Sequence, residues 1–148
     1  MAKLLEPIFE WDPEAGIAMC ILSDGKNSYC GSAYCSEEDQ DMKSEKTGCY
    51  IAEGRARINY LVHLRDNEIL PKYEALHELY YAMIQSKRFN KDSYEVHMLQ
   101  KKMSQYQFEI EAVRDMLKEE KATLKEYMRQ KAILYKKVRE NRATDKSN

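Results

Sequence analysis

The chain has 148 residues and a net charge of −1, with 33% charged and 43% apolar residues. This length suits one domain with a modest core, and a content of five Gly and three Pro favours long solvated helices over a sandwich or barrel. No run approaches the roughly eighteen apolar residues of a membrane span, and acid and proline interrupt the N-terminus before a signal-peptide core forms. We therefore expect a cytoplasmic protein with no membrane partner.

Charge is distributed unevenly along the chain. Residues 1–50 hold four Lys against ten Asp or Glu, net −6, whereas residues 114–142 hold ten Lys or Arg against five acids, net +5. Such polarity favours association between copies and offers a basic surface to an anionic ligand, although ordinary solvated helix faces give the same pattern. The acidic head argues against nucleic acid as a partner, because nucleic-acid affinity comes from neutralising phosphates.

Three short apolar or alternating runs open the chain, over residues 4–11, 17–22 and 28–35. The segments between them, residues 12–16 and 23–26, contain Asp-Pro and Asp-Gly pairs that favour turns. The pattern predicts a three-stranded antiparallel β-meander within residues 1–35. Three strands with one polar face are stable only when something covers the other face, so we expect a helix to pack on the sheet.

Two helices are expected after a polar loop over residues 36–48. Apolar residues recur every three or four positions over 49–86, which predicts a helix that kinks or restarts at Pro71, because proline lacks an amide donor. Residues 87–93 are polar and rich in capping residues, and are predicted to be a connector to a second helix over 94–142. Residues 143–148 are expected to fray.

The second helix carries an apolar seam close to a 3.5-residue repeat, interrupted at Glu120 and Lys131. The seam consists of Leu99, Met103, Tyr106, Ile110, Val113, Leu117, Leu124, Tyr127, Leu134 and Val138. A helix of this length reaches about 75 Å at 1.5 Å per residue, which exceeds its predicted partner. Part of the seam then lacks an intrachain partner, so self-association is expected. The prediction is a single α+β domain over 1–148: a β-meander followed by a long helical hairpin with a coiled-coil-like second helix.

The sequence shows no catalytic or metal site. Cys20, Cys30, Cys35 and Cys49 lack the close C-x-x-C spacing of structural zinc sites, so reduced core thiols are favoured over zinc or disulfides. The three histidines are scattered, and there is no P-loop, G-x-S-x-G, H-E-x-x-H or G-x-G-x-x-G motif. We expect no catalytic residues, no cofactor and no enzymatic activity.

Arginines and aromatic residues coincide in a pattern that suits a nucleotide. Arg57 lies on the first predicted helix, and Tyr80, Arg88, Phe89 and Asn90 gather near the hairpin tip. A guanidinium pairs with phosphate oxygens, an aromatic face stacks on a purine, and an asparagine amide reads a base or ribose edge. A structural interpretation stays open beside this one: Tyr80 also fits the apolar stripe of its helix, and Phe89 a hydrophobic staple.

Scattered short matches point to a family. The segments Gly31-Ser32-Ala33-Tyr34-Cys35, Glu38-Asp39, Thr47-Gly48, Ile51-Ala52 and Arg55-Ala56, together with the meander and helical hairpin, resemble the first family of Thoeris anti-defence proteins of bacteriophages. The resemblance implies a sponge that binds a cyclic ADP-ribose isomer, and in some members cyclic trinucleotides, without cleaving it. It also implies dimers or hexamers formed through the helices, in the cytoplasm of the host cell.

The resemblance assigns roles to particular residues, with pockets expected between subunits. Its ligand-binding residues would be Arg57, Tyr80, Phe89, Asn90 and Arg129, to which the pattern at the hairpin tip adds Arg88. The arginines would hold phosphates, with Arg129 coming from a neighbouring chain. Tyr80 or Phe89 would stack on adenine, and Asn90 would be its polar partner.

Two other functions fit the same residues. The chain could be a protein-interaction inhibitor or assembly factor that acts through its acidic head or its coiled-coil arm. In that case Glu37, Glu38, Asp39 and Asp41 would mimic nucleic-acid phosphates, although acids in a loop are usually just solvated. A third hypothesis is a nucleic-acid-binding protein that uses the basic arm.

Overall fold

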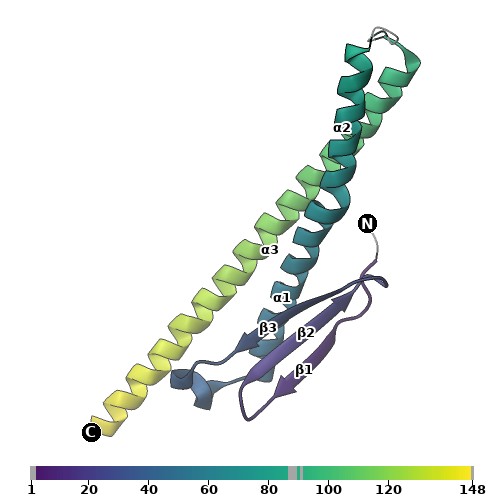
Figure 1. Ribbon diagram of the computed structural model, residues 1–148. Coiled ribbons are helices and arrows are strands. Elements are labelled where there is room, and N and C mark those ends of the chain that lie inside the picture. Colours follow the sequence, from purple (N-terminus) through teal and green to yellow (C-terminus); the bar gives the residue numbers. More distant parts are fainter. Residues whose placement is uncertain (1–2, 87–89, 91, 148) are drawn as a thin grey trace. The chain divides into compact units, whose positions relative to one another are not determined.

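The computed structural model describes residues 3–86, 90 and 92–147. The elements are β1 (Ile8–Asp12), β2 (Ile17–Ser23), β3 (Ser28–Tyr34), the 3₁₀ helix η1 (Glu37–Met42), α1 (Glu45–His63), the π-helical turn η2 (Leu64–Ile69), α2 (Leu70–Gln85) and α3 (Tyr94–Ser147) (Figure 1). The chain divides into two compact units: a first unit of Met1–Tyr60 with Glu119–Asn148, and a second unit of Leu61–Lys118. The predicted α+β class, with a meander followed by two long helices, is confirmed.

The three strands form an antiparallel sheet in the order β1-β2-β3. Asp12 closes the first turn, since its carboxylate accepts the amides of Glu14 and Ala15 and its carbonyl accepts that of Gly16, whose φ is 68°. Asp24 closes the second turn in the same way, with its Oδ1 accepting two amides. Both predicted turns are therefore confirmed, and they follow from side chains that replace backbone partners locally.

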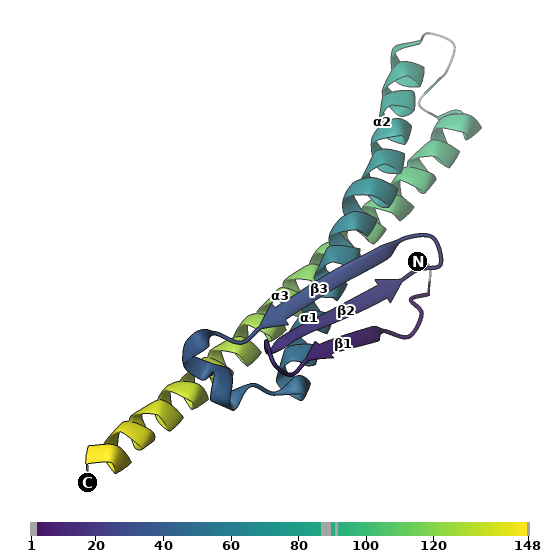
Figure 2. The ribbon, with the colours of Figure 1, turned by 60° about the horizontal axis from the view of Figure 1, so that its bottom comes forward.

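Helix α1 covers the inner face of the sheet at very close range (Figures 1 and 2). A Cβ placed on Gly31 would lie 2.1 Å from the carbonyl oxygen of Ala52 and 2.4 Å from the amide nitrogen of Ala56. A Cβ placed on Gly48, on the same side of α1, would lie 3.0 Å from the Cβ of Ala18. Small residues on both elements thus set the distance between helix and sheet, and the expected covering helix is α1.

The outer face of the sheet is mixed, which corrects the expectation of a polar second face. The register places the alternate side chains of all three strands on this side. They are Ile8, Glu10, Asp12, Ile17, Met19, Ile21, Ser23, Ser28, Cys30, Ser32 and Tyr34, so apolar side chains share this face with acids and serines. Tyr34 is 79% exposed and Ile8 61%. Period-two alternation shows which residues share a face, but it does not show which face a helix covers. Cys30 lies on this outer face and is exposed, so it is not the core thiol that was expected.

Two side chains of α1 cover the free edge of β3. The guanidinium of Arg55 donates to the carbonyl oxygen of Ser32 at 2.7 Å, and the Asn59 amide donates to that of Cys30, also at 2.7 Å. Unpaired edge carbonyls are a template for pairing with another chain. Arg55 and Asn59 therefore protect this edge of the sheet.

The first long helix begins at Glu45, four residues before the predicted start at Cys49, and the loop before it contains η1. Ser44 explains the earlier start, because its Oγ accepts the amide of Thr47 and its carbonyl accepts that of Gly48. Serine is a favoured N-cap residue. The end of this helix at Gln85 agrees with the prediction.

The irregularity expected at Pro71 lies in the turn before it. Residues Leu64–Ile69 are π-helical, and the Leu70 amide donates to the carbonyl of Arg65, five residues back. Pro71 follows in the first turn of α2, where a missing amide hydrogen costs little. The helix therefore continues through residue 71.

In the second unit, α2 and the first part of α3 form an antiparallel hairpin. The buried α3 residues of this unit are Val96, Leu99, Ile110, Val113 and Leu117. The amide of Gln100 donates to the Tyr80 hydroxyl at 3.2 Å across the two helices. The predicted connector, residues 87–93, falls largely outside the described residues.

Helix α3 continues to Ser147, so the frayed tail predicted for residues 143–148 is wrong as far as residue 147. Side-chain bonds within the helix reinforce its last turns, as the Thr144 hydroxyl donates to the Glu140 carbonyl and the Ser147 hydroxyl to that of Ala143. Among the described helices, none has an apolar stretch long enough to cross a membrane.

Candidate functional site

The first unit joins α1 to the distal part of α3 through three layers of contact. The rings of Tyr50 and Tyr127 lie 4.1 Å apart between centroids. A Cβ at Gly54 would meet the side chain of Leu124 at 3.1 Å. Residue numbers increase along α1 while those of the contacting residues on α3 decrease, so the two helices run antiparallel.

The third layer holds Arg57, the first predicted ligand residue. Its Nη1 lies 2.8 Å from a carboxylate oxygen of Glu53, and its Nε lies 3.1 Å from one of Glu120. The Nε is buried, and the geometry at 3.1 Å does not make a hydrogen bond to Glu120. Two carboxylates thus balance one guanidinium, and an anionic ligand must compete with both of them for Arg57.

Glu120, predicted to interrupt the seam of α3, supplies the carboxylate from α3 that lies beside the Arg57 guanidinium. The partner Glu53 was visible in the sequence, because it precedes Arg57 by four residues on a helix. No local pattern indicated Glu120, which is 63 positions away along the chain and was brought close only by helix packing.

Arg129 is exposed on α3 and pairs with Glu126, one turn earlier on its own helix. It lies nine residues beyond Glu120, which corresponds to about 13 Å along the helix axis at 1.5 Å per residue. Arg57 and Arg129 therefore do not converge within one chain. A site that uses both guanidiniums needs Arg129 from another copy, as the family resemblance implies.

The hairpin-tip residues belong to the second unit. Tyr80 is half-buried and bonded to Gln100, which fits the structural interpretation of this tyrosine. Asn90 is exposed, and its side-chain oxygen accepts the Asp92 amide at 3.3 Å. Arg88 and Phe89 lie outside the described residues. The assignment of all six residues to a ligand stays a prediction.

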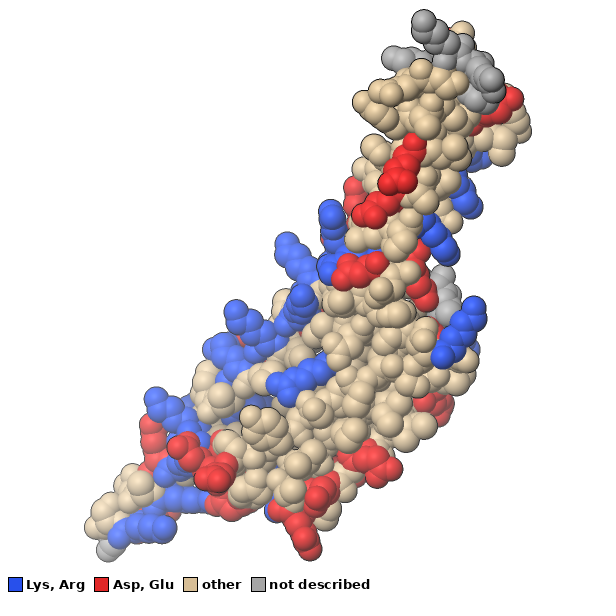
Figure 3. Space-filling model, in the orientation of Figure 1, with Lys and Arg blue, Asp and Glu red and all other residues tan. Residues whose placement is uncertain are grey.

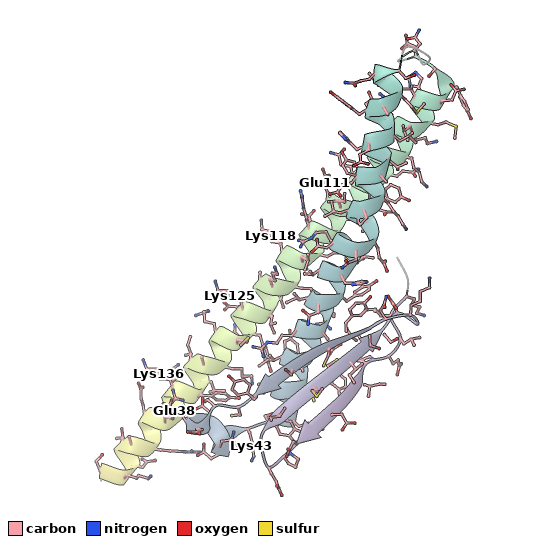
Figure 4. All side chains as sticks on the ribbon, in the orientation of Figure 1. Glu38, Lys43, Glu111, Lys118, Lys125 and Lys136 are labelled. Atoms are coloured by element: carbon pink, nitrogen blue, oxygen red, sulfur yellow. The ribbon has the colours of Figure 1, made fainter. Side chains whose placement is uncertain are left out.

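Free basic charge gathers on the distal part of α3. Figure 3 shows Lys and Arg side chains along this helix, and Figure 4 shows Lys125 and Lys136 pointing away from α1 and the sheet. Lys121, Lys125 and Lys136 are exposed and form no ion pair with any residue that the structure describes. In the sequence this charge was apparent only as a net excess, and none of these three lysines was predicted to bind a ligand.

Part of the acidic head is neutralised by the chain itself. Arg139 pairs with Asp39 and lies 3.7 Å from a Glu38 oxygen, and Arg142 pairs with Asp41. Three of the four acids proposed as phosphate mimics thus hold the end of α3. The charge asymmetry between head and tail is satisfied in part within one chain.

A small hollow lies between the sheet, the start of α1 and α3 in the first unit. Trp11, Tyr34, Lys43, Thr47 and Tyr135 are among the residues that line it, and burial raises the pKa of the Tyr135 hydroxyl. Its volume is about 70 Å³, well below the roughly 300–1,000 Å³ of small-molecule sites. A nucleotide does not fit this hollow.

The four cysteines are free thiols, and only Cys20 is buried. Burial is the main cause that raises the pKa of Cys20 to about 11, and burial also raises the pKa values of Cys35 and Cys49. Thiolate, the form that attacks and ligates, is therefore scarce at these three positions near neutral pH. Within residues 3–86, 90 and 92–147, no group of three or more His, Cys, Asp or Glu side chains is placed to hold a metal ion.

Comparisons with protein-family models, curated proteins and solved structures find no match for the chain.

Proposed function

We propose that the chain is a non-catalytic sponge that binds a small cyclic nucleotide signal, a cyclic ADP-ribose isomer or a cyclic oligonucleotide, and holds it intact. One structural observation supports it most: exposed lysines on distal α3 that no described carboxylate neutralises. A phosphate-bearing ligand supplies the missing negative charge. The confirmed combination of meander and helical hairpin also agrees with the architecture on which the family resemblance rests.

The ligand would lie between copies of the chain. The hollow of the first unit is too small for a nucleotide, and Arg57 and Arg129 are too far apart within one chain to share one. In the proposed pocket Arg57 of one copy and Arg129 of a neighbouring chain hold phosphates. The hairpin-tip residues come from another copy, with Arg88 on phosphate and Tyr80 or Phe89 stacked on adenine beside Asn90. Retention replaces turnover, so slow release matters more than fast association.

Thermal unfolding with cyclic nucleotides tests this function. A ligand that binds only the native state raises the melting temperature as its concentration exceeds the dissociation constant. We expect a rise for the native chain and for Arg114→Ala, an exposed arginine on the same helix, and a smaller rise for Arg129→Ala. Ligand recovered intact after heating would support a sponge over an enzyme. If no cyclic nucleotide changes the melting temperature, the proposal fails.

A second function is favoured by the apolar side chains on the outer face of the sheet. Exposed apolar patches rimmed by acids are typical of protein-interaction sites, and Glu10 and Asp12 stand among the isoleucines here. This feature supports the protein-interaction alternative, acting through the sheet rather than through the η1 acids. Retention of a host protein after exhaustive dialysis of small molecules, abolished by Ile17→Asp and unaffected by Ala122→Asp at an exposed position of α3, would favour it.

A further inference from the structure

The outer side of α3 in the second unit carries large apolar residues in solvent. Tyr94 is 74% exposed, Phe108 72%, Met98 55% and Met116 39%. With three smaller or polar residues they form a second seam, whose members are Tyr94, Met98, Lys101, Gln105, Phe108, Ala112 and Met116. The first five spacings, of four, three, four, three and four, are those of coiled-coil core positions, and Met116 lies one residue beyond the next one.

This second seam is distinct from the seam that faces α2. The buried residues of the same stretch, Val96, Leu99 and Ile110 among them, lie roughly 150° around the helix from it at 100° per residue. Helix α2 therefore covers one side of α3. The four large residues of the second seam remain exposed.

The second seam contains both parts of a knob-into-hole contact. An open groove on α3 is lined by residues that include Met98, Lys101, Lys102 and Gln105. Their positions i, i+3, i+4 and i+7 are those of the four residues that receive one knob from a facing helix. Phe108, large and exposed, is the matching knob, but it lies about 10 Å along the axis from the centre of the hole. Only another chain can place a Phe108 there.

We infer that a second copy of this chain docks antiparallel on this seam, with the two-fold axis near Gln105. Each Phe108 then enters the groove of the other copy, Tyr94 meets Met116, and Met98 meets Ala112. The apolar residues of the two copies cover one another in pairs. All of these residues lie in the second unit.

Charge decides the orientation of the two helices. In the antiparallel arrangement Lys102 of each copy lies beside Glu109 of the other, and Glu109 forms no ion pair with any described residue of its own chain. In a parallel pair in register, Lys101 would face its own copy within the seam. Like charges in contact oppose that arrangement.

The mass of the full chain in solution tests the docking surface. The native chain should sediment at twice 17.5 kDa or more at tens of micromolar. Phe108→Lys, which brings a third positive charge to the hole, should lower that mass at least twofold, whereas Gln107→Lys, on the neighbouring exposed position away from the seam, should not. Both residues are exposed, so neither change should alter the fold, as circular dichroism checks. A native mass of 17.5 kDa, or an unchanged mass for Phe108→Lys, would overturn the inference.

Charge reversal tests the antiparallel register. Lys102→Glu and Glu109→Lys should each raise the dimer dissociation constant on the order of tenfold, because each replaces two symmetric attractive pairs with repulsive ones. The double variant restores opposite charges across the interface and should return close to the native constant. A double variant as weak as the single ones would exclude this register.

The proposed dimer and the proposed ligand binding can each be disproved without the other. A native chain that dimerises but binds no cyclic nucleotide would remove the proposed function and keep the docking surface. A native chain that is monomeric alone but associates when it binds one would remove the docking surface and keep the proposed function.

Discussion

Gly31 shows how one residue sets the distance between the sheet and α1. The hydrogen at its Cα faces backbone atoms of Ala52 and Ala56, which cannot rotate away as a side chain would. We predict that Gly31→Ala lowers the free energy of unfolding by about 1–3 kcal/mol or more, because overpacking forces the backbone apart. Urea unfolding measures it. Ser32→Ala, on the exposed side of the same strand, should change stability by less than about 0.5 kcal/mol.

The cysteines differ in exposure, so they should differ in reactivity. At pH 8 a thiol reagent should modify the exposed Cys30 first and leave Cys20 unmodified until the chain unfolds. Cys20 has its pKa raised to about 11, so it stays a neutral thiol at this pH. Intact mass before and after denaturation counts the modified thiols, and Cys30→Ser should remove the fast phase. Rapid modification of Cys20 in the native chain would contradict this assignment.

At the scale of elements, the contacts between α1 and α3 bury only part of the predicted seam within one chain. Leu124 is buried against Gly54, whereas Leu134, predicted to continue the seam, is 48% exposed. Tyr135 lines the hollow of the first unit in its place. A 3.5-residue repeat was assumed for the whole helix, whereas an α-helix has 3.6 residues per turn. The predicted seam therefore rotates away from the buried face toward the C-terminal end of α3.

This difference gives a matched pair of variants. Leu124→Ala should lower the free energy of unfolding by about 2–5 kcal/mol, since it leaves a cavity. Leu134→Ala should cost less than about 0.5 kcal/mol. Chemical unfolding of the two variants compares the positions directly, and equal losses would mean that the predicted seam was right after all.

At the scale of the whole molecule, ion pairs join the head to the end of the chain. Asp39 and Arg139 are 100 positions apart in the sequence. We predict that Asp39→Asn with Asp41→Asn raises amide hydrogen exchange over residues 139–147 on the order of fivefold, because exposed ion pairs contribute roughly 0.2–1 kcal/mol each. Glu37→Gln, which alters an η1 acid without an ion pair, is the control. Unchanged exchange in the double variant would show that the pairs do not hold this end.

Much of the fold and part of the candidate site could be predicted from local patterns. The turns at Asp12 and Asp24 depend on side chains bonding amides two or three residues on, and the helix end at Gln85 falls before a polar connector. For the site, Arg57 and Arg129 could be placed on helices, but the pairing of Arg57 with Glu120 could not be foreseen. It depends on how two distant helices align.

The sequence by itself determined the strands, their turns and two long helices, because hydrogen bonds between near neighbours fix those features. Only the tertiary structure decided which charges pair within the chain and which apolar faces stay open. It showed Asp39 and Asp41 paired with arginines, Lys125 without an ion pair to any described residue, and Phe108 in solvent. These properties depend on which remote segments meet, and packing energies between distant residues leave no local pattern in the chain.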